Sequence, residues 1–208
     1  SNTVVWIKPN CNVVGHVAGV TYSILMTNPG DAYTIENITQ FTNVSGQNLS
    51  GSVIVSDKPI AVTVADDSVS GVTGCFDLMG YQIVPVEIVG KDYIVLKGAM
   101  NGPEHEGAYI VGTENFTSIT INDGVITNTI INKGDTYHYK TTQGLTSVIA
   151  DKNVYVLHAT GYGCELGEAL LPPLTCAGSS LVAFSRNNTQ PFRLNILCKN
   201  GVQNTLDR

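Results

Sequence analysis

Short apolar stretches alternate with polar turns along almost the whole of this 208-residue chain. Most stretches are strand-sized and rich in Val, Ile, Thr and Tyr, which is the pattern of β-strands. Asn122-Asp123-Gly124 separates two of them and predicts a tight hairpin, because these residue types tolerate positive φ. Helical periodicity is nearly absent, so the pattern predicts an all-β, antiparallel fold. The clearest predicted strands are residues 22–26, 52–55, 60–65, 93–96, 109–111, 118–121 and 154–159.

An internal repeat sets the predicted organisation of the chain. The segment SVIVSDKPIAV at residues 52–62 aligns with SVIADKNVYV at residues 147–156 after one single-residue gap. Each copy contains a strand, an Asp-Lys turn and a second strand, and a cysteine follows both. We therefore expect a duplicated unit of about ninety residues. The first β repeat unit would cover residues 1–107 and the second residues 108–208, in which residues 192–196 resemble the start of a third.

Two packings suit a unit of this length, because it holds enough short strands for a β-sandwich or for propeller-like blades. We expect β-sandwich-like packing. The 208 residues would close only a small propeller, and neither end of the chain completes a blade.

Charged residues are sparse, at 13% of the chain, and the net charge is -6. The eleven basic residues form no cluster, which excludes nucleic-acid binding, since phosphate neutralisation needs grouped Lys and Arg. The apolar stretches are far shorter than the roughly 20 residues of a membrane helix, so no membrane insertion is expected. A surface of Thr, Ser, Asn and Gly is common on secreted β-proteins, and it predicts an extracellular or cell-surface location.

Five cysteines lack the C-x-x-C pairs that zinc ribbons and thioredoxin-like sites need. The nearest pair, Cys164 and Cys176, would close a short loop around Pro172 and Pro173. In an oxidising compartment this spacing predicts a disulfide. The alternative is that several of the five are small, buried apolar side chains.

Aspartates near a predicted strand form one candidate metal site. Asp66 and Asp67 follow the strand at residues 60–65 directly, and Asp77 lies a little further on. Loop carboxylates of this kind can hold calcium, and the sequence predicts no other cofactor. Turn capping is the alternative role, and the absence of matching acids from the second copy favours it.

Three tyrosines are the candidate ligand-binding residues. Tyr137 and Tyr139 flank His138, and Tyr162 lies in the loop before Cys164. Exposed tyrosines can stack on sugars or contact a protein partner. Ordinary cross-strand pairing is the alternative for all three.

Catalytic chemistry has little support, so we expect a protein that is not an enzyme. No serine elbow occurs, and the histidines are far apart. His158 alternates with two valines and is predicted to be a buried, hydrogen-bonded imidazole. The Glu104-His105-Glu106 stretch is predicted to be a solvated loop rather than a metal site. Glu165 and Glu168 are the closely spaced pair that a polysaccharide hydrolase would need.

The repeat carries a resemblance to a known family. Residues 55–62, 66–69 and 75–86 resemble the N-terminal region of the IgGFc-binding protein family. Residues 154–165, with residues 171–173 and Cys176, look like the form found in large secreted or surface proteins of Bacteroidota. The resemblance covers residues 50–186 and implies an extracellular, adhesive or mucus-associated role without catalytic residues.

The leading hypothesis is therefore a non-catalytic binding or adhesion module whose partner is a glycan, a mucin or a host protein. The first alternative is a structural spacer repeat in a large surface protein. The second, less favoured, is a polysaccharide hydrolase.

Overall fold

The computed structural model describes residues 2–38, 48–72, 74–102, 105–179, 181–184, 189, 194–198 and 200, without the side chains of residues 67, 68 and 71. The chain divides into two compact units, Ser1–Ala177 and Gly178–Arg208. The predicted division into residues 1–107 and 108–208 rests on sequence similarity and stays a prediction.

All regular structure in the described residues is β-strand, which confirms the predicted all-β fold, and none of them forms a helix that could cross a membrane. The predicted strands at residues 22–26, 118–121 and 154–159 all lie within observed ones. The strands are β1 (Thr3–Lys8), β2 (Tyr22–Met26), β3 (Val53–Ser56), β4 (Val62–Val72), β5 (Cys75–Ile83), β6 (Gly90–Leu96), β7 (Ala99–Met100), β8 (Gly107–Gly112), β9 (Thr117–Asn122), β10 (Ile126–Ile131), β11 (Thr136–Lys140), β12 (Leu145–Gly163) and β13 (Glu165–Leu170).

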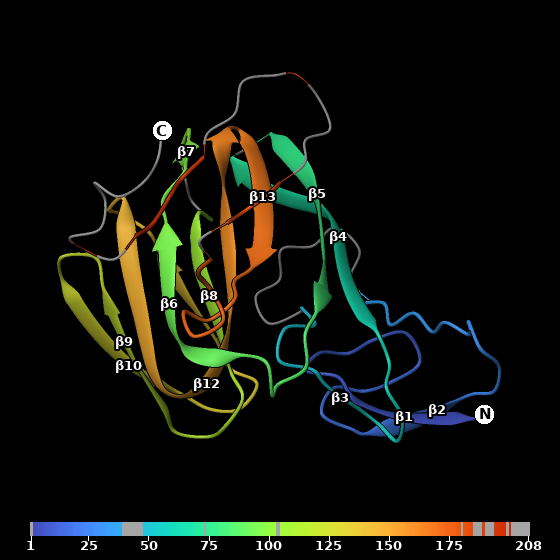
Figure 1. The fold of residues 1–208 in the computed structure, drawn as a ribbon. Helices are drawn as coiled ribbons and strands as arrows, with labels where there is room; N and C mark the ends of the chain where they lie inside the picture. Colours follow the sequence, from blue (N-terminus) through green and yellow to red (C-terminus); the bar gives the residue numbers. More distant parts are fainter. Residues whose placement is uncertain are drawn as a thin grey trace. The chain divides into compact units, whose positions relative to one another are not determined.

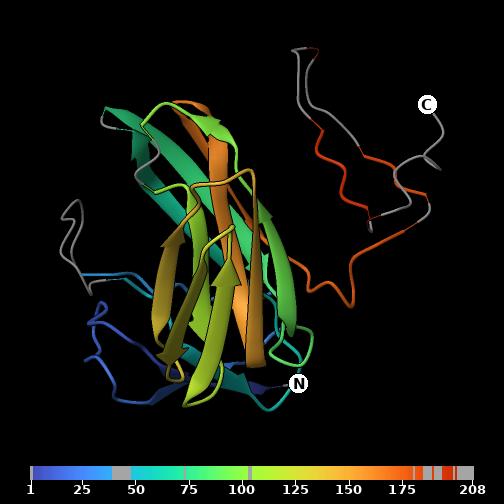
Figure 2. The same ribbon diagram turned by 90° about the vertical axis from the view of Figure 1, so that its left-hand side faces the viewer.

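An eight-stranded sheet of order β10-β9-β12-β8-β11 forms most of the first unit, with β6, β7 and β13 also paired to β12 (Figure 1). The strands curve around a common interior, so the sheet is nearly closed and barrel-like (Figure 2). The 19-residue strand β12 organises it. The first part of β12 pairs with β9 and β6, and the later part with β8 and β13. Its register against β6 shifts between Ile149 and Val154. The predicted Asn122-Asp123-Gly124 turn joins β9 and β10 as an antiparallel hairpin.

The core of this sheet is built by strict alternation. Along β9, for example, Thr117, Ile119 and Ile121 point inward and are fully buried, while Ser118 and Asn122 are exposed. Such period-two burial is what a strand with one covered face requires. The inward cluster comprises Tyr93, Val95, Ala108, Ile110, Ile119, Ile121, Ile131, Val148, Ala150, Val154 and Val156.

The hairpin β4–β5 forms a second layer against β13 (Figure 1). Met79 from the hairpin packs with Met100, Ala159 and Leu166 in a smaller buried cluster. This layered arrangement agrees with the expected sandwich-like packing.

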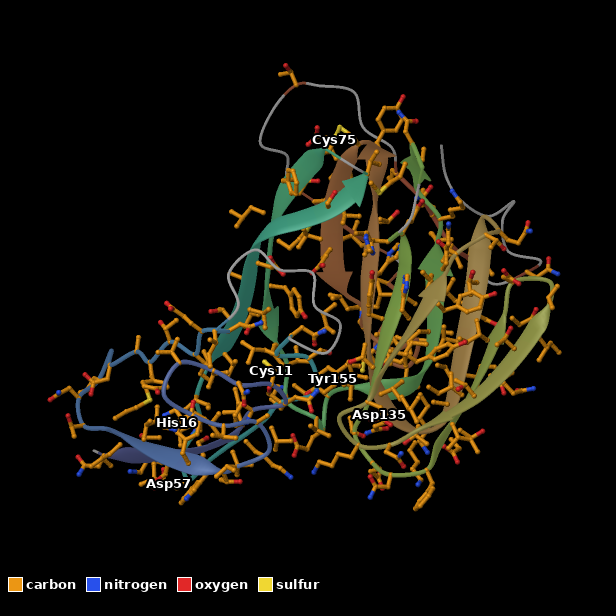
Figure 3. The ribbon with its side chains drawn as sticks, turned by 180° about the vertical axis from the view of Figure 1, so that it is seen from behind. Cys11, His16, Asp57, Cys75, Asp135 and Tyr155 are labelled. Carbon is orange, nitrogen blue, oxygen red and sulfur yellow. A yellow bond between two sulfur atoms is a disulfide. The ribbon has the colours of Figure 1, made fainter. Side chains whose placement is uncertain are left out.

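A three-stranded antiparallel sheet of order β2-β1-β3 precedes that hairpin. Val5 and Ile7 are buried on one side of β1, and Trp6 and Lys8 are exposed on the other. The carboxylate of Asp57, labelled in Figure 3, accepts a 2.8 Å hydrogen bond from the backbone N–H of Val4. This bond ties the end of β3 to β1.

The predicted Cys164–Cys176 disulfide is wrong, because Cys164 is bonded to Cys75, with Cα atoms 5.9 Å apart. Cys75 lies at the tip of the β4–β5 hairpin (Figure 3), and Cys164 at the turn between β12 and β13. After Cys164 the chain runs back antiparallel to β12 as β13. The N–H of Leu174 then donates to the carbonyl of Asp92 on β6, which pairs with Ile149 near the start of β12. Cys176 is therefore carried away from Cys164, and it is exposed and free.

The other free cysteines are Cys11 and Cys198. Cys11 is buried, and this burial raises the pKa of its thiol. It is the small buried apolar side chain that the alternative interpretation of the cysteines anticipated. Cys198 is exposed and belongs to the second unit, whose described residues contain no regular structure.

Candidate binding surfaces

Asp66 and Asp67 were predicted to lie in a loop after a strand, but both lie within β4, and Asp77 lies within β5 of the same hairpin. Asp66 stands opposite Met79, and Asp77 opposite Val69. Asp77 accepts a 2.8 Å hydrogen bond from the backbone N–H of Leu166, so it joins the hairpin to β13. Among the described residues no group of three metal-ligating side chains occurs, and the side chain of Asp67 lies outside them. Calcium binding here stays a prediction.

The two glutamates of the hydrolase alternative do not form a pair. Glu165 is exposed on one face of β13, whereas Glu168 shares the opposite, partly buried face with Leu166. Residues three apart in a strand project from opposite faces. Burial and the nearby Asp66 carboxylate raise the pKa of Glu168. The paired-carboxylate site that the hydrolase alternative needs is therefore absent from β13.

The predicted ligand-binding tyrosines occupy two places on the sheet. Tyr137 and Tyr139 lie on one face of β11, half-buried against the main core. Tyr162 is exposed near the end of β12, beyond the part of that strand that neighbours β8. The structure therefore does not gather the three tyrosines in one site, and a ligand role for them stays a prediction.

Tyr137 does line a pocket of about 410 Å³ in the first unit. The N–H of Asn10 donates to Ser52 Oγ at 3.0 Å, and the hydroxyls of Ser50 and Thr136 lie 2.6 Å apart. The lining is almost entirely amide, hydroxyl and aliphatic, with one carboxylate: Asn10, Asn48, Ser50, Thr129, Ile130, Ile131, Gly134, Asp135, Thr136 and Tyr137. It offers hydrogen bonds from neutral groups beside one aromatic ring.

A contact between two glycines holds the rim of this pocket together. Gly51 and Gly134 both have positive φ, +81° and +85°, which suits glycine. A Cβ added to Gly51 would collide with the carbonyl oxygen of Gly134. Only glycine at residue 51 therefore lets the turn before β3 approach the turn before β11 this closely.

The N-terminal sheet presents an apolar outward face that the sequence interpretation missed. Trp6 lies on the central strand β1 directly opposite Val55 of β3, and the neighbouring Val4 stands opposite Leu25 of β2. Trp6, Leu25 and Val55 are between 41% and 56% exposed. We call these three residues the Trp6 face. The alternation in Val4-Val5-Trp6-Ile7-Lys8 could have revealed it, since Trp6 falls on the polar side of the pattern with Lys8.

A buried polar cluster lies where β12 approaches β6 and β8. Glu106, which was predicted to lie in a solvated loop, is fully buried. Its carboxylate accepts hydrogen bonds from the N–H of Gly98 and, at 2.8 Å, from the hydroxyl of Thr160, and it lies 3.4 Å from the ammonium of Lys97. Every interaction it makes is internal, so this carboxylate acts as a structural anchor. His105 of the same stretch is exposed, and Glu104 lies outside the described residues.

His158 belongs to the same region. Burial lowers the pKa of its imidazole, against smaller effects of a hydrogen bond to the backbone of Leu96 and of the Glu106 carboxylate. Among the described residues, Nε2 has no hydrogen-bond partner. The predicted burial of the imidazole is confirmed.

The sequence profile of one protein family, described as IgGFc binding protein, matches residues 1–207 of the chain. No curated protein sequence matches the chain, and no solved structure matches it. The profile match covers almost the whole chain, including the N-terminal sheet, and is wider than the resemblance carried by residues 50–186.

Proposed function

We propose that this chain, which belongs to the IgGFc-binding protein family, is an extracellular module that binds a protein partner through its Trp6 face. The family is one of binding domains, which agrees with a protein-recognition role. The Cys75–Cys164 disulfide agrees with an oxidising, extracellular compartment.

The Trp6 face is the observation that carries the proposal. Tryptophan is the residue most enriched among the few side chains that dominate binding energy at protein interfaces. Here the single tryptophan of the chain lies on the middle strand of a sheet, with apolar neighbours on both flanking strands. Such a face offers a flat apolar centre of the kind found in the core of protein interfaces.

The family description names the first partner to test, which is the Fc region of immunoglobulin G. Mucins and other host proteins are the other proposed partners. The wider setting that we propose is adhesion by a large surface protein of Bacteroidota, supported by residues 154–165 and 171–173.

The test measures binding of the whole chain to immobilised Fc and to mucin by surface plasmon resonance. Trp6→Ala should weaken binding by about thirtyfold or more, since such central residues contribute about 2 kcal/mol. Phe76→Ala is the matched control, because Phe76 is an exposed aromatic residue on β5. Equal binding by both variants would place the site elsewhere. Absence of binding to every protein tested would favour the spacer alternative.

A glycan ligand is the second candidate function, and the pocket beside Tyr137 favours it. Its volume of about 410 Å³ is within the range of small-ligand sites. Neutral amides and hydroxyls beside one aromatic ring suit the hydroxyls and apolar faces of a sugar. Tyr137→Phe and Asn48→Ala should reduce signals on a glycan array, whereas Thr120→Val, on the outward face of β9 and outside the pocket, should not.

A further inference from the structure

Strand β10 is an edge of the eight-stranded sheet, and among the described residues it pairs only with β9. Its outward side chains are those of Ile126, Asn128 and Ile130, and the two isoleucines are 64% and 68% exposed. Natural edge strands usually carry a lysine, a proline or a bulge that prevents pairing with another chain. Residues 124–131 contain no charged residue and no proline. Nothing in the strand itself opposes contact with a second chain.

Residues 126–130 of β10 have the same sequence in both directions about Asn128, because they are Ile-Thr-Asn-Thr-Ile. A second copy that runs antiparallel, related by a two-fold axis at Asn128, would place its Ile130 against Ile126. It would also place its Asn128 against Asn128. A two-fold interface requires a surface that is complementary to itself in this way.

The charged residues that flank β10 are also placed symmetrically about Asn128. Asp123 precedes Asn128 by as many residues as Lys133 follows it. The two-fold axis therefore brings Asp123 of one copy toward Lys133 of the other at both ends of the contact. Two molecules of net charge -6 repel each other, and an uncharged strand with complementary ends is where they could meet without opposing like charges.

We propose that two copies of this chain associate through the outward side chains of β10, antiparallel and about a two-fold axis at Asn128. Binding of an unrelated partner would require an apolar patch on β10, but it would not require the sequence and the charges of β10 to be symmetric about Asn128. This symmetry therefore favours a second copy of the chain as the partner. The inference does not rest on the Trp6 face, because Trp6 lies on a different sheet, whereas Ile130 also lines the pocket of the second candidate function. The dimer would carry two Trp6 faces.

Disulfide trapping in solution tests the geometry. The full chain carries Cys176→Ser and Cys198→Ser, which removes the exposed thiols and keeps the Cys75–Cys164 bond. Asn128→Cys should cross-link to itself under oxidised glutathione. Ile126→Cys alone and Ile130→Cys alone should not, because each would lie about 13 Å from its own copy, beyond the reach of a disulfide. An equimolar mixture of these two variants should cross-link.

Sedimentation velocity supplies the second readout. Ile130→Lys should weaken dimerisation by about tenfold or more, because a charge would replace an apolar contact on both copies. Ile88→Lys is the matched control, an exposed isoleucine between β5 and β6 that should leave dimerisation unchanged. Lys133→Glu should weaken dimerisation at low salt and less so at high salt.

A monomer at every concentration, or no cross-linking through Asn128→Cys, would overturn the proposal. Cross-linking of Ile126→Cys alone as efficient as that of the mixture would also overturn it. Loss of Fc or mucin binding in a dimer with intact β10 contacts would concern only the proposed function.

Discussion

Single residues in the buried polar cluster stabilise the fold in a way that their positions in the sequence do not indicate. Glu104-His105-Glu106 has no apolar periodicity, so it was expected to be a loop in solvent. The last of the three residues instead directly precedes the buried start of β8, Gly107 and Ala108. Residue pattern alone could not show this, because one partner of Glu106, Thr160, lies 54 residues further along the chain.

Removing the Glu106 carboxylate should destabilise the protein. Glu106→Ala leaves the N–H of Gly98 and the hydroxyl of Thr160 without their acceptor in a buried site, and we expect a loss of about 3 kcal/mol. Lys97→Met should lower stability less, because the Lys97 side chain is about a quarter exposed. Urea unfolding of both variants measures the difference. Equal losses would mean that the ion pair, rather than the hydrogen bonds to Glu106, dominates.

His158 should make stability fall in mild acid. Its folded pKa lies below the ordinary value of 6.5, so the unfolded chain binds a proton more readily than the folded one. Stability is then fully present above about pH 6.5 and falls as the pH drops below that value. Glu168 acts in the opposite direction, because its pKa is raised and protonation favours the folded state.

Comparison with His158→Asn isolates the histidine, since asparagine can keep a donor toward Leu96. The unfolding free energy of each protein is measured between pH 8 and pH 5. The difference between wild type and variant should change with pH over this interval. A constant difference would show that His158 is not the group that titrates.

At the scale of elements, the strands were predictable and their partners were not. The apolar stretches predicted β2 and β9, and the Asn122-Asp123-Gly124 sequence predicted the β9–β10 turn, because each is encoded by neighbouring residues. The pairing of β12 with β9 and β6 along its first part and with β8 and β13 along its later part has no local signal in the sequence, and neither has its register shift against β6 after Ile149. The same holds for the disulfide, since proximity in sequence favoured Cys176 whereas the packing of two hairpins brought Cys75 to Cys164.

The two bonded cysteines occupy corresponding places in the proposed repeat. The aligned segment ends at the start of β4 in the first copy and lies within β12 in the second, and the hairpins β4–β5 and β12–β13 each turn at a cysteine. We propose that these hairpins are the duplicated elements and that the disulfide joins equivalent positions of the two copies.

Loss of this disulfide should lower stability by about 2 to 4 kcal/mol, since it closes a long loop in the unfolded chain. Cys75→Ser with Cys164→Ser is compared with Cys176→Ser, which should have no effect. Guanidinium unfolding without reductant measures stability, and peptide mapping identifies the bond. A stability loss confined to Cys176→Ser would restore the pairing expected from spacing.

The Gly51–Gly134 contact allows a matched test of close backbone approach. Gly51 and Gly15 have the same φ of +81°, but only Gly51 has a neighbour within 4 Å of an added Cβ. Gly15→Ala should cost about 1 kcal/mol through backbone strain alone. Gly51→Ala should cost more, because the carbonyl of Gly134 must also move. Similar melting temperatures for the two variants would argue that the contact is loose.

At the scale of the whole molecule, the sequence did not anticipate that its C-terminal residues would form a separate unit. The apolar pattern of residues 192–196 suggested a new strand, but residues 192 and 193 lie outside the described part and residues 194–196 form no strand there. An apolar segment becomes a strand only where an edge is available to pair with it.

Removal of residues 178–208 should therefore leave the first unit folded. The truncated chain should unfold cooperatively with a melting temperature within about 2 °C of the full chain, since none of the described strands is lost. Differential scanning calorimetry of both chains provides the comparison. A large fall in melting temperature would show that the first unit depends on those residues.

The Cys75–Cys164 bond also has a mechanical consequence. When a chain is pulled by its ends, a covalent bridge carries the load past everything between the bridged residues. Here they are separated by 89 positions, and the intervening segment includes β6 to β12. Fully extended, that segment would add about 300 Å to the length of the chain. In a module under tension, the segment between the two cysteines would not be extended while the disulfide is intact. The N-terminal strands, which lie outside the bridged segment, would bear the load and unfold before β10.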